Sequence, residues 1–73
     1  MVKIMNLHPY EIHMYVDGAY IMSIPSQRYL TYNAIKEGWH VFTFTKVLAA
    51  TIKNRVSEKT LNITGYTEIT IAP

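Results

Sequence analysis

The chain has 73 residues, contains no cysteine and carries a formal net charge of +2. A chain this short is expected to form one domain, 1–73, and the missing cysteines exclude disulfide staples, thiolate metal sites and thiol nucleophiles. The opening residues lack the apolar run of a secretory signal, and no other stretch is long enough to span a membrane. We therefore expect a cytoplasmic protein that does not enter a membrane.

Composition indicates a partner. Apolar residues make up 49% of the chain and charged residues 16%, against a usual charged share of about 25%. One small core cannot hide this much apolar surface, so part of it is expected to face another molecule. A homodimer is the first expectation, because two-fold pairs are the commonest oligomers. The small net charge does not by itself indicate nucleic acid.

The first third of the chain predicts strands. Residues 2–7 form an apolar run that Pro9 ends, which indicates an edge strand. Residues 11–16 then alternate between apolar and polar side chains and lead into Asp17-Gly18, a pair typical of a two-residue hairpin turn.

This turn predicts the hairpin register and its two faces. The expected pairs are Val16 with Ala19, Tyr15 with Tyr20, Met14 with Ile21 and His13 with Met22. The expected core face holds Ile12, Met14, Val16, Ala19 and Ile21, and the reverse face holds His13, Tyr15, Tyr20 and Met22. The reverse face is unusually apolar for one that meets solvent.

The middle of the chain predicts a helix over 26–37. Ser26 can cap its first turn and Gly38 its last. At helical spacing, one face carries Leu30, Thr31, Ala34 and Ile35, and the opposite face carries Arg28, Tyr29, Tyr32 and Lys36. The first face is expected to pack on the sheet.

The last part begins with a predicted central strand over 39–45, whose apolar residues suggest that both faces are covered. The stretch 46–59 fits a helix or a strand, and we favour the helix, because a strand continuing from Trp39 would be very long. One or two closing strands follow around Gly65-Tyr66. The predicted fold is α+β: a mainly antiparallel sheet with a β-hairpin and one or two packed helices.

No catalytic machinery is recognisable. The three histidines, His8, His13 and His40, match no metal motif, and the carboxylates are scattered singly along the chain. No serine sits in a nucleophile elbow and no glycine-rich loop could hold a phosphate. We predict neither an enzyme, nor a metal site, nor a cofactor.

The predicted helix carries the first candidate surface. Arg28, Tyr29, Tyr32 and Lys36 combine residue types enriched at protein interfaces with types that stack on bases and neutralise phosphates. Three readings stay open: the tyrosines complete the core, contact a protein, or contact nucleic acid. The second candidate interface is Tyr15, Tyr20 and Met22, on the reverse face of the hairpin.

Two short segments resemble a known group of proteins. Asn6-Leu7-His8-Pro9-Tyr10 and Ile24-Pro25-Ser26 resemble small uncharacterised phage and bacterial proteins that open N-L-T-P-H and continue to I-P-P-S. The chain differs at His8, at Tyr10 and at 27–28. The resemblance implies a viral or prophage origin and no function.

We therefore expect a small non-enzymatic binding protein, an accessory or inhibitor protein of a virus or prophage that acts on a host protein. The alternative is a small nucleic-acid-binding protein that uses Arg28, Tyr29, Tyr32 and Lys36.

Overall fold

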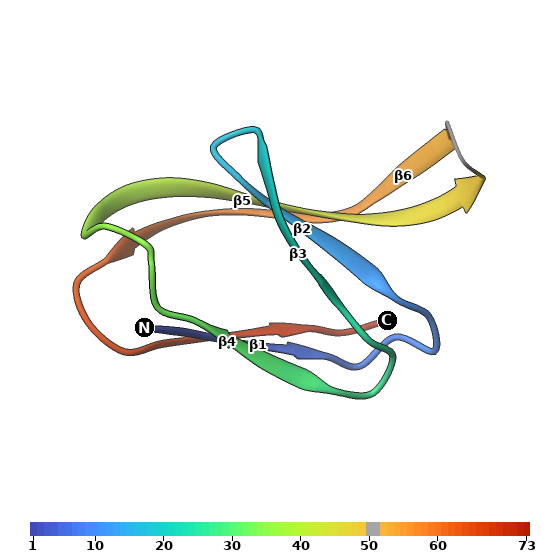
Figure 1. The fold of residues 1–73 in the computed structure, drawn as a ribbon, viewed down its shortest axis with the longest axis horizontal. Helices are drawn as coiled ribbons and strands as arrows, with labels where there is room; N and C mark the ends of the chain where they lie inside the picture. Colours follow the sequence, from blue (N-terminus) through green and yellow to red (C-terminus); the bar gives the residue numbers. More distant parts are fainter. Residues whose placement is uncertain (50–51) are drawn as a thin grey trace.

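The computed structural model describes the backbone of residues 1–49 and 52–73, and the side chains outside 47–53. This part of the chain forms seven strands in two layers and no helix (Figure 1). The strands are β1 (Val2–Asn6), β2 (Ile12–Val16), β3 (Ala19–Ile24), β4 (Tyr29–Tyr32), β5 (Gly38–Ala49), β6 (Ile52–Ile63) and β7 (Thr67–Ile71). The prediction of an α+β fold is therefore wrong: the described chain is all-β. It contains no helix long and apolar enough to cross a membrane.

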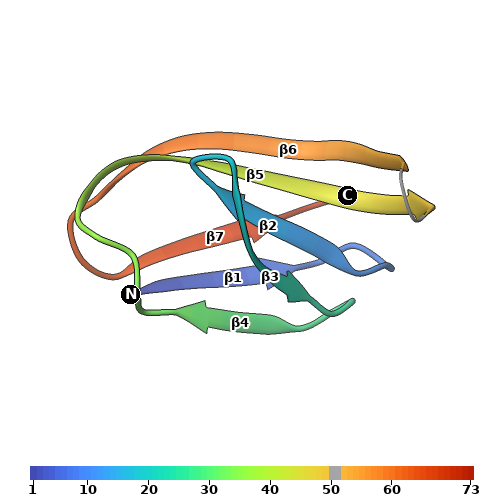
Figure 2. The same cartoon turned by 45° about the horizontal axis from the view of Figure 1, so that its top comes forward.

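One layer is a sheet in the order β4-β1-β7, and the other is a sheet in the order β3-β2-β5-β6 (Figure 2). β1 pairs antiparallel with β4 and parallel with β7, so the prediction that the first strand is an edge is wrong. Pro9 lies beyond the end of β1 at Asn6, and its missing N–H therefore removes no hydrogen bond from the ladder. β5 lies between β2 and β6, as the sequence predicted for a central strand.

The core lies between the two sheets. Alternate residues of β1 and β2 are buried, and Val2 and Ile4 of one sheet belong to the same core cluster as Ile12 and Met14 of the other. The buried apolar residues are Val2, Ile4, Ile12, Met14, Val16, Ile24, Phe42, Phe44, Ile63, Ile69 and Ile71. All seven strands except the short β4 contribute to this set.

The predicted hairpin turn is confirmed. Asp17 and Gly18 have φ angles of 51° and 84°, as a type I′ turn requires. Val16 pairs with Ala19 and Tyr15 with Tyr20, but the register then shifts, and Met14 pairs with Met22 instead of Ile21. The extra residue is a β-bulge. It turns Met22 to the inner face, and Ala19 is exposed instead of buried.

The predicted helix over 26–37 is replaced by a turn, the strand β4 and a connecting loop. The hydroxyl of Ser26 donates to the carbonyl of His8 at 2.9 Å instead of capping a helix. Leu30 and Tyr32 pack against the core while Tyr29 and Thr31 are exposed, which is the alternation of a strand. The strand propensity of these residues and their pairing with β1 therefore decide the structure of this segment, although its apolar residues also fit helical spacing.

The predicted helix over 46–59 is also wrong. β5 and β6 form a long antiparallel hairpin whose ladder runs from Gly38 with Ile63 to Ala49 with Ile52. Two register shifts interrupt it, and such bulges increase local twist, which lets long strands follow a curved sheet. The stripe that suggested a helix falls largely on 48–52, whose side chains lie outside the described residues.

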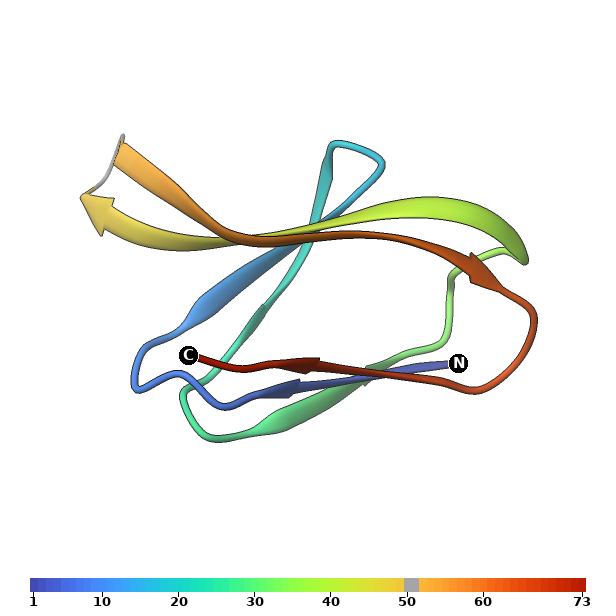
Figure 3. The ribbon, with the colours of Figure 1, turned by 180° about the vertical axis from the view of Figure 1, so that it is seen from behind.

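The connections between the two sheets gather at two ends of the sandwich. Loops 7–11 and 25–28 cross at one end, and loops 33–37 and 64–66 cross at the other (Figure 3). Each end therefore brings together segments that are distant in sequence.

At the first end, the crossing loops are joined by one buried side chain. Asn6 is fully buried. Its Nδ2 donates to the carbonyls of Tyr10, Ile24 and Pro25 at 2.9, 3.1 and 3.2 Å, and its Oδ1 accepts from the amide of His8 at 2.9 Å. The two segments that resemble phage proteins are thus neighbours in space.

The hairpin turn generates a first prediction. Gly18→Val places a β-branched residue at positive φ, which is expected to lower the free energy of unfolding by about 1 kcal/mol or more. Gly65→Val is the matched control, because Gly65 is free of neighbours in the same way but does not have a positive φ. The denaturant midpoints of the two variants are measured. An equal loss of stability in both would contradict the prediction that the turn at Gly18 requires a positive φ.

The buried asparagine generates a second prediction. Asn6→Ala removes the four hydrogen bonds of this side chain, although the Pro25 carbonyl keeps a second donor, the amide of Arg28. We therefore expect a loss of about 3 kcal/mol or more in the free energy of unfolding. Asn62→Ala, at an exposed site on β6, should change stability by less than about 0.5 kcal/mol. Similar midpoints for the two variants would show that the Asn6 network contributes little.

Candidate binding surface

The outer face of the four-stranded sheet carries a cluster of aromatic rings. His13, Tyr15 and Tyr20 lie on this face, opposite the buried side chains of β2. The ring centroid of Tyr20 lies 5.4 Å from that of His13 and 5.7 Å from that of Tyr15. The hydroxyl of Tyr20 also lies 2.7 Å from that of Ser23. These contacts fix the ring of Tyr20, although the residue is 53% exposed.

β5 extends this apolar surface along the same face. Trp39 and Val41 alternate with the buried Phe42 and Phe44, and they are 70% and 36% exposed. Thr43, the next outward residue, pairs directly with Tyr15. We call the set His13, Tyr15, Tyr20, Trp39 and Val41 the outer aromatic face. The sequence prediction that both faces of this strand are covered is wrong, because only its inner face is.

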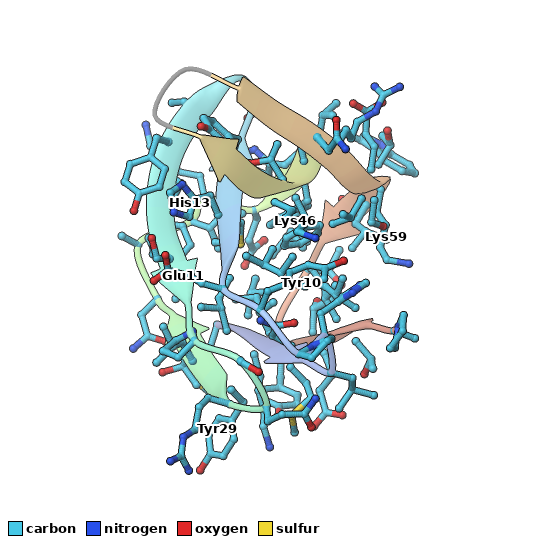
Figure 4. The ribbon with its side chains drawn as sticks, turned by 90° about the vertical axis from the view of Figure 1, so that its right-hand side faces the viewer. Tyr10, Glu11, His13, Tyr29, Lys46 and Lys59 are labelled. Atoms are coloured by element: carbon cyan, nitrogen blue, oxygen red, sulfur yellow. The ribbon has the colours of Figure 1, made fainter. Side chains whose placement is uncertain are left out.

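Carboxylates surround the outer aromatic face. Glu11 lies 3.3 Å from Nε2 of His13 (Figure 4). Glu58 accepts from Arg55 at 3.2 Å and from the hydroxyl of Thr43 at 3.4 Å. With Asp17 at the hairpin turn, three of the five acidic residues of the chain lie at this face.

Asp17 is held in place by its neighbours on β5. Its Oδ2 lies 2.6 Å from Nδ1 of His40, and its Oδ1 accepts from the amide of Val41 at 2.9 Å. The hydrogen bond to His40, followed by that to Val41, lowers the pKa of Asp17 below its ordinary value of 3.8. The hydrogen bond to Asp17 in turn raises the pKa of His40 above 6.5. The hairpin turn is thereby fixed against the start of β5.

Among the residues whose side chains are described, one further titratable group is perturbed, in loop 64–66. The hydroxyl of Tyr66 donates to Glu68 at 2.7 Å. This bond raises the pKa of Tyr66 above its ordinary value of 10.0, because the carboxylate stabilises the protonated hydroxyl.

The structure does not bring the four residues of the first predicted site together. Tyr29 is 55% exposed on the outer face of the three-stranded sheet, where Nζ of Lys3 lies 4.4 Å from its ring centroid. Tyr32 points the opposite way and packs, half-buried, against the core. Arg28 precedes β4, and Lys36 lies in the loop at the far end of that strand. A spacing of three residues aligns side chains on a helix but separates them on a strand.

The second predicted interface is brought together in part. Tyr15 and Tyr20 form the ring contact described above, whereas Met22 faces inward and packs against the core because of the bulge. Trp39 and Val41 were not predicted as contact residues. Their alternation with His40, Phe42 and Phe44 was the available signal, but the sequence could not show that a second layer would cover only one side.

The three histidines lie in different surroundings. His8 is buried beside Tyr10, His13 lies on the outer aromatic face, and His40 lies between Asp17 and the Lys36 carbonyl. Within residues 1–46 and 54–73, whose side chains are described, no three metal-ligating side chains converge. No pocket opens in the described surface. The outer aromatic face is therefore the feature from which a function can be argued.

A buried hydroxyl beside this face generates a third prediction. The Oγ1 of Thr45 is buried and has no hydrogen-bond partner. Thr45→Val removes that hydroxyl at nearly constant shape, so the free energy of unfolding is expected to rise by roughly 1 kcal/mol. Thr43→Val is the control, because its hydroxyl has Glu58 as a partner. The free energy of unfolding of both variants is measured by chemical denaturation. A loss of stability in Thr45→Val would contradict the prediction that its buried hydroxyl destabilises the fold.

Comparisons with known proteins add no identification. No protein-family model matches the chain, and neither the curated proteins nor the solved structures give a significant match. The functional argument therefore rests on the geometry of the outer aromatic face.

Proposed function

We propose that this chain is a non-enzymatic binding protein and that the outer aromatic face contacts a protein partner. The observation that carries the proposal is the position of Tyr20, Trp39 and Val41, which are all exposed on one face of one sheet. Aromatic residues at the centre of a polar rim are typical of protein interfaces, and Trp and Tyr supply most interface hot spots.

The charges around this face favour a protein over nucleic acid. Among the described side chains, Glu11, Asp17 and Glu58 outnumber their cationic partners Arg55 and His40 at this face, so it offers no net positive charge to phosphates. Other cations of the described chain lie elsewhere, such as Lys46, whose Nζ is 4.2 Å from the ring centroid of Tyr10 (Figure 4). A partner with basic residues around an apolar centre would complement the face.

A different protein fits this face better than a second copy does. A two-fold contact places a patch against itself, so the acidic rim of one copy would approach the acidic rim of the other. The predicted homodimer stays a prediction, with the outer aromatic face as the less favourable place for it. The predicted phage or prophage origin also stays a prediction.

A second candidate function has one observation in its favour. Lys3 and Tyr29 form a cation–π pair on the outer face of the three-stranded sheet, and Arg28 is exposed beside Tyr29. Such residues can stack on bases and contact phosphates. Glu68, opposite Lys3 in the register, weakens this possibility.

A binding comparison with matched variants tests the proposal. The double variant Tyr20→Ala and Trp39→Ala removes the most exposed rings of the outer aromatic face. Tyr29→Ala and Tyr66→Ala is the control, because these tyrosines are 55% and 57% exposed but lie on the other layer and in loop 64–66, outside the outer aromatic face. Proteins retained from a host lysate by the parent chain are identified, and the affinity of each is measured for all three forms, with circular dichroism confirming that each is folded.

We expect one retained protein to lose about 2 kcal/mol, or roughly 30-fold in affinity, with the Tyr20 and Trp39 variant alone. Equal losses in both double variants, or none in either, would overturn the proposal. If generic RNA or DNA binds with a steep salt dependence, and only the Tyr29 and Tyr66 variant loses it, the second candidate is the function. Light scattering of the free chain at high micromolar concentration reports whether it pairs with itself.

A further inference from the structure

His40 lies between two hydrogen-bond acceptors at the end of the sandwich where loop 33–37 crosses between the sheets. Its Nδ1 is 2.6 Å from Oδ2 of Asp17, and its Nε2 is 2.7 Å from the carbonyl oxygen of Lys36. A carbonyl and an ionised carboxylate can only accept, so both ring nitrogens must carry a proton. The contacts therefore require the imidazolium form of His40.

The two acceptors belong to segments distant in sequence. Asp17 forms the β2–β3 turn, whereas Lys36 lies in loop 33–37, which joins β4 in one sheet to β5 in the other. In the described part of the chain, this loop makes no backbone–backbone hydrogen bond to another segment. The Nε2 bond to Lys36 and the half-buried side chain of Ile35 are the contacts that hold it.

We propose that the imidazolium of His40 is a proton-operated clasp that holds crossing loop 33–37 to the hairpin turn, and that loss of its proton releases the loop. A neutral imidazole has one N–H and cannot serve both acceptors. The bond to the carboxylate is charge-assisted and stronger, so the remaining proton stays on Nδ1. The Lys36 carbonyl then faces a lone pair on Nε2 and moves away.

In the described chain, the two segments that bond to the His40 ring carry three charged residues. Asp17 faces it from the hairpin turn, the exposed side chains of Lys36 and Glu37 flank it from the loop, and Leu61 is its uncharged partner on β6. Among the side chains that the structure describes, Asp17 is the one carboxylate bonded to the His40 ring.

The sign of the pH dependence follows from these contacts. The bond to Asp17 raises the pKa of His40, so the stabilisation is complete below the ordinary value of 6.5 and is lost as pH rises through the raised value. The pKa of Asp17 is lowered, so the stabilisation of the fold by its ionised carboxylate is present above pH 3.8. This stabilisation is lost as pH falls through the lowered pKa. The clasp is therefore closed between the lowered pKa of Asp17 and the raised pKa of His40, and it opens above the latter.

The clasp is independent of what the outer aromatic face binds. Release of the loop is expected to change the outer aromatic face nearby, because Trp39 and Val41 flank His40 on β5. Trp39 is also the one tryptophan of the chain, which makes its fluorescence a specific reporter at this site.

A pH titration of the full chain tests the proposal. Trp39 fluorescence and NMR signals of His40 and of the Glu37 amide, which shares the peptide group of the Lys36 carbonyl, are followed between pH 5 and 9. We expect one common midpoint above 6.5. Asp17→Asn should move this midpoint down, His40→Gln should abolish it, and His13→Gln should leave it unchanged.

A His40 midpoint at or below 6.5 would overturn the proposal. So would a Glu37 amide that does not follow His40, because the loop would then be indifferent to the proton. If His40→Gln does not fold, the titrations of the parent chain and of Asp17→Asn still decide the question.

Discussion

The amide of Asn6 is the interaction on which the two-layer arrangement depends. Loops 7–11 and 25–28 cross between the sheets at the same end, and backbone carbonyls of both regions point toward the interior there. A buried carbonyl without a donor costs more free energy than one hydrogen bond normally contributes. Asn6 offers two N–H groups to three carbonyls and accepts from His8 with its oxygen. No apolar side chain could replace it, and a carboxylate would place negative charge against carbonyl oxygens.

The opposite end is held in a different way, so we expect only that end to respond to pH. Asn6 is buried and does not titrate, whereas the His40 side chain is 17% exposed and depends on a proton. The apolar core between the ends consists of inward-facing side chains from both sheets. A sandwich built in this way has no second layer over its outer faces. The rings of Tyr20 and Trp39 are therefore free to meet another molecule without loosening the core.

The sequence predicts those parts of the fold that are determined by neighbouring residues, and it does not predict those determined by contacts between distant segments. The turn at Asp17-Gly18 was predicted correctly because positive φ is a property of two adjacent residues. The segment 26–37 was predicted as a helix because Leu30, Ala34 and Ile35 also fit helical spacing. The segment 46–59 was predicted as one because its own apolar residues fit that spacing and one strand continuing from Trp39 would be very long. Their strand state is decided by pairing with β1 and β5, which no local window contains. The bulge opposite Met14 and Tyr15 could not be predicted from the sequence either, and it moved Met22 from the outer face to the inner one.

The two predicted surfaces also differ in whether neighbouring residues or distant contacts determine them. Tyr15 and Tyr20 could be placed together from the sequence, because a two-residue turn sets their pairing directly. Arg28, Tyr29, Tyr32 and Lys36 could not, because their common face existed only if the segment was helical. Trp39 shows a third case: its strand was predicted, but its exposure depends on which side of the sheet the other layer covers. The covered side is the one that faces the layer of β1 and β7, whose residues Ile4, Ile69 and Ile71 share the buried core with Phe42 and Phe44, and Trp39 lies on the other side. The position of the outer aromatic face is thus a consequence of pairing between the first and last strands of the chain.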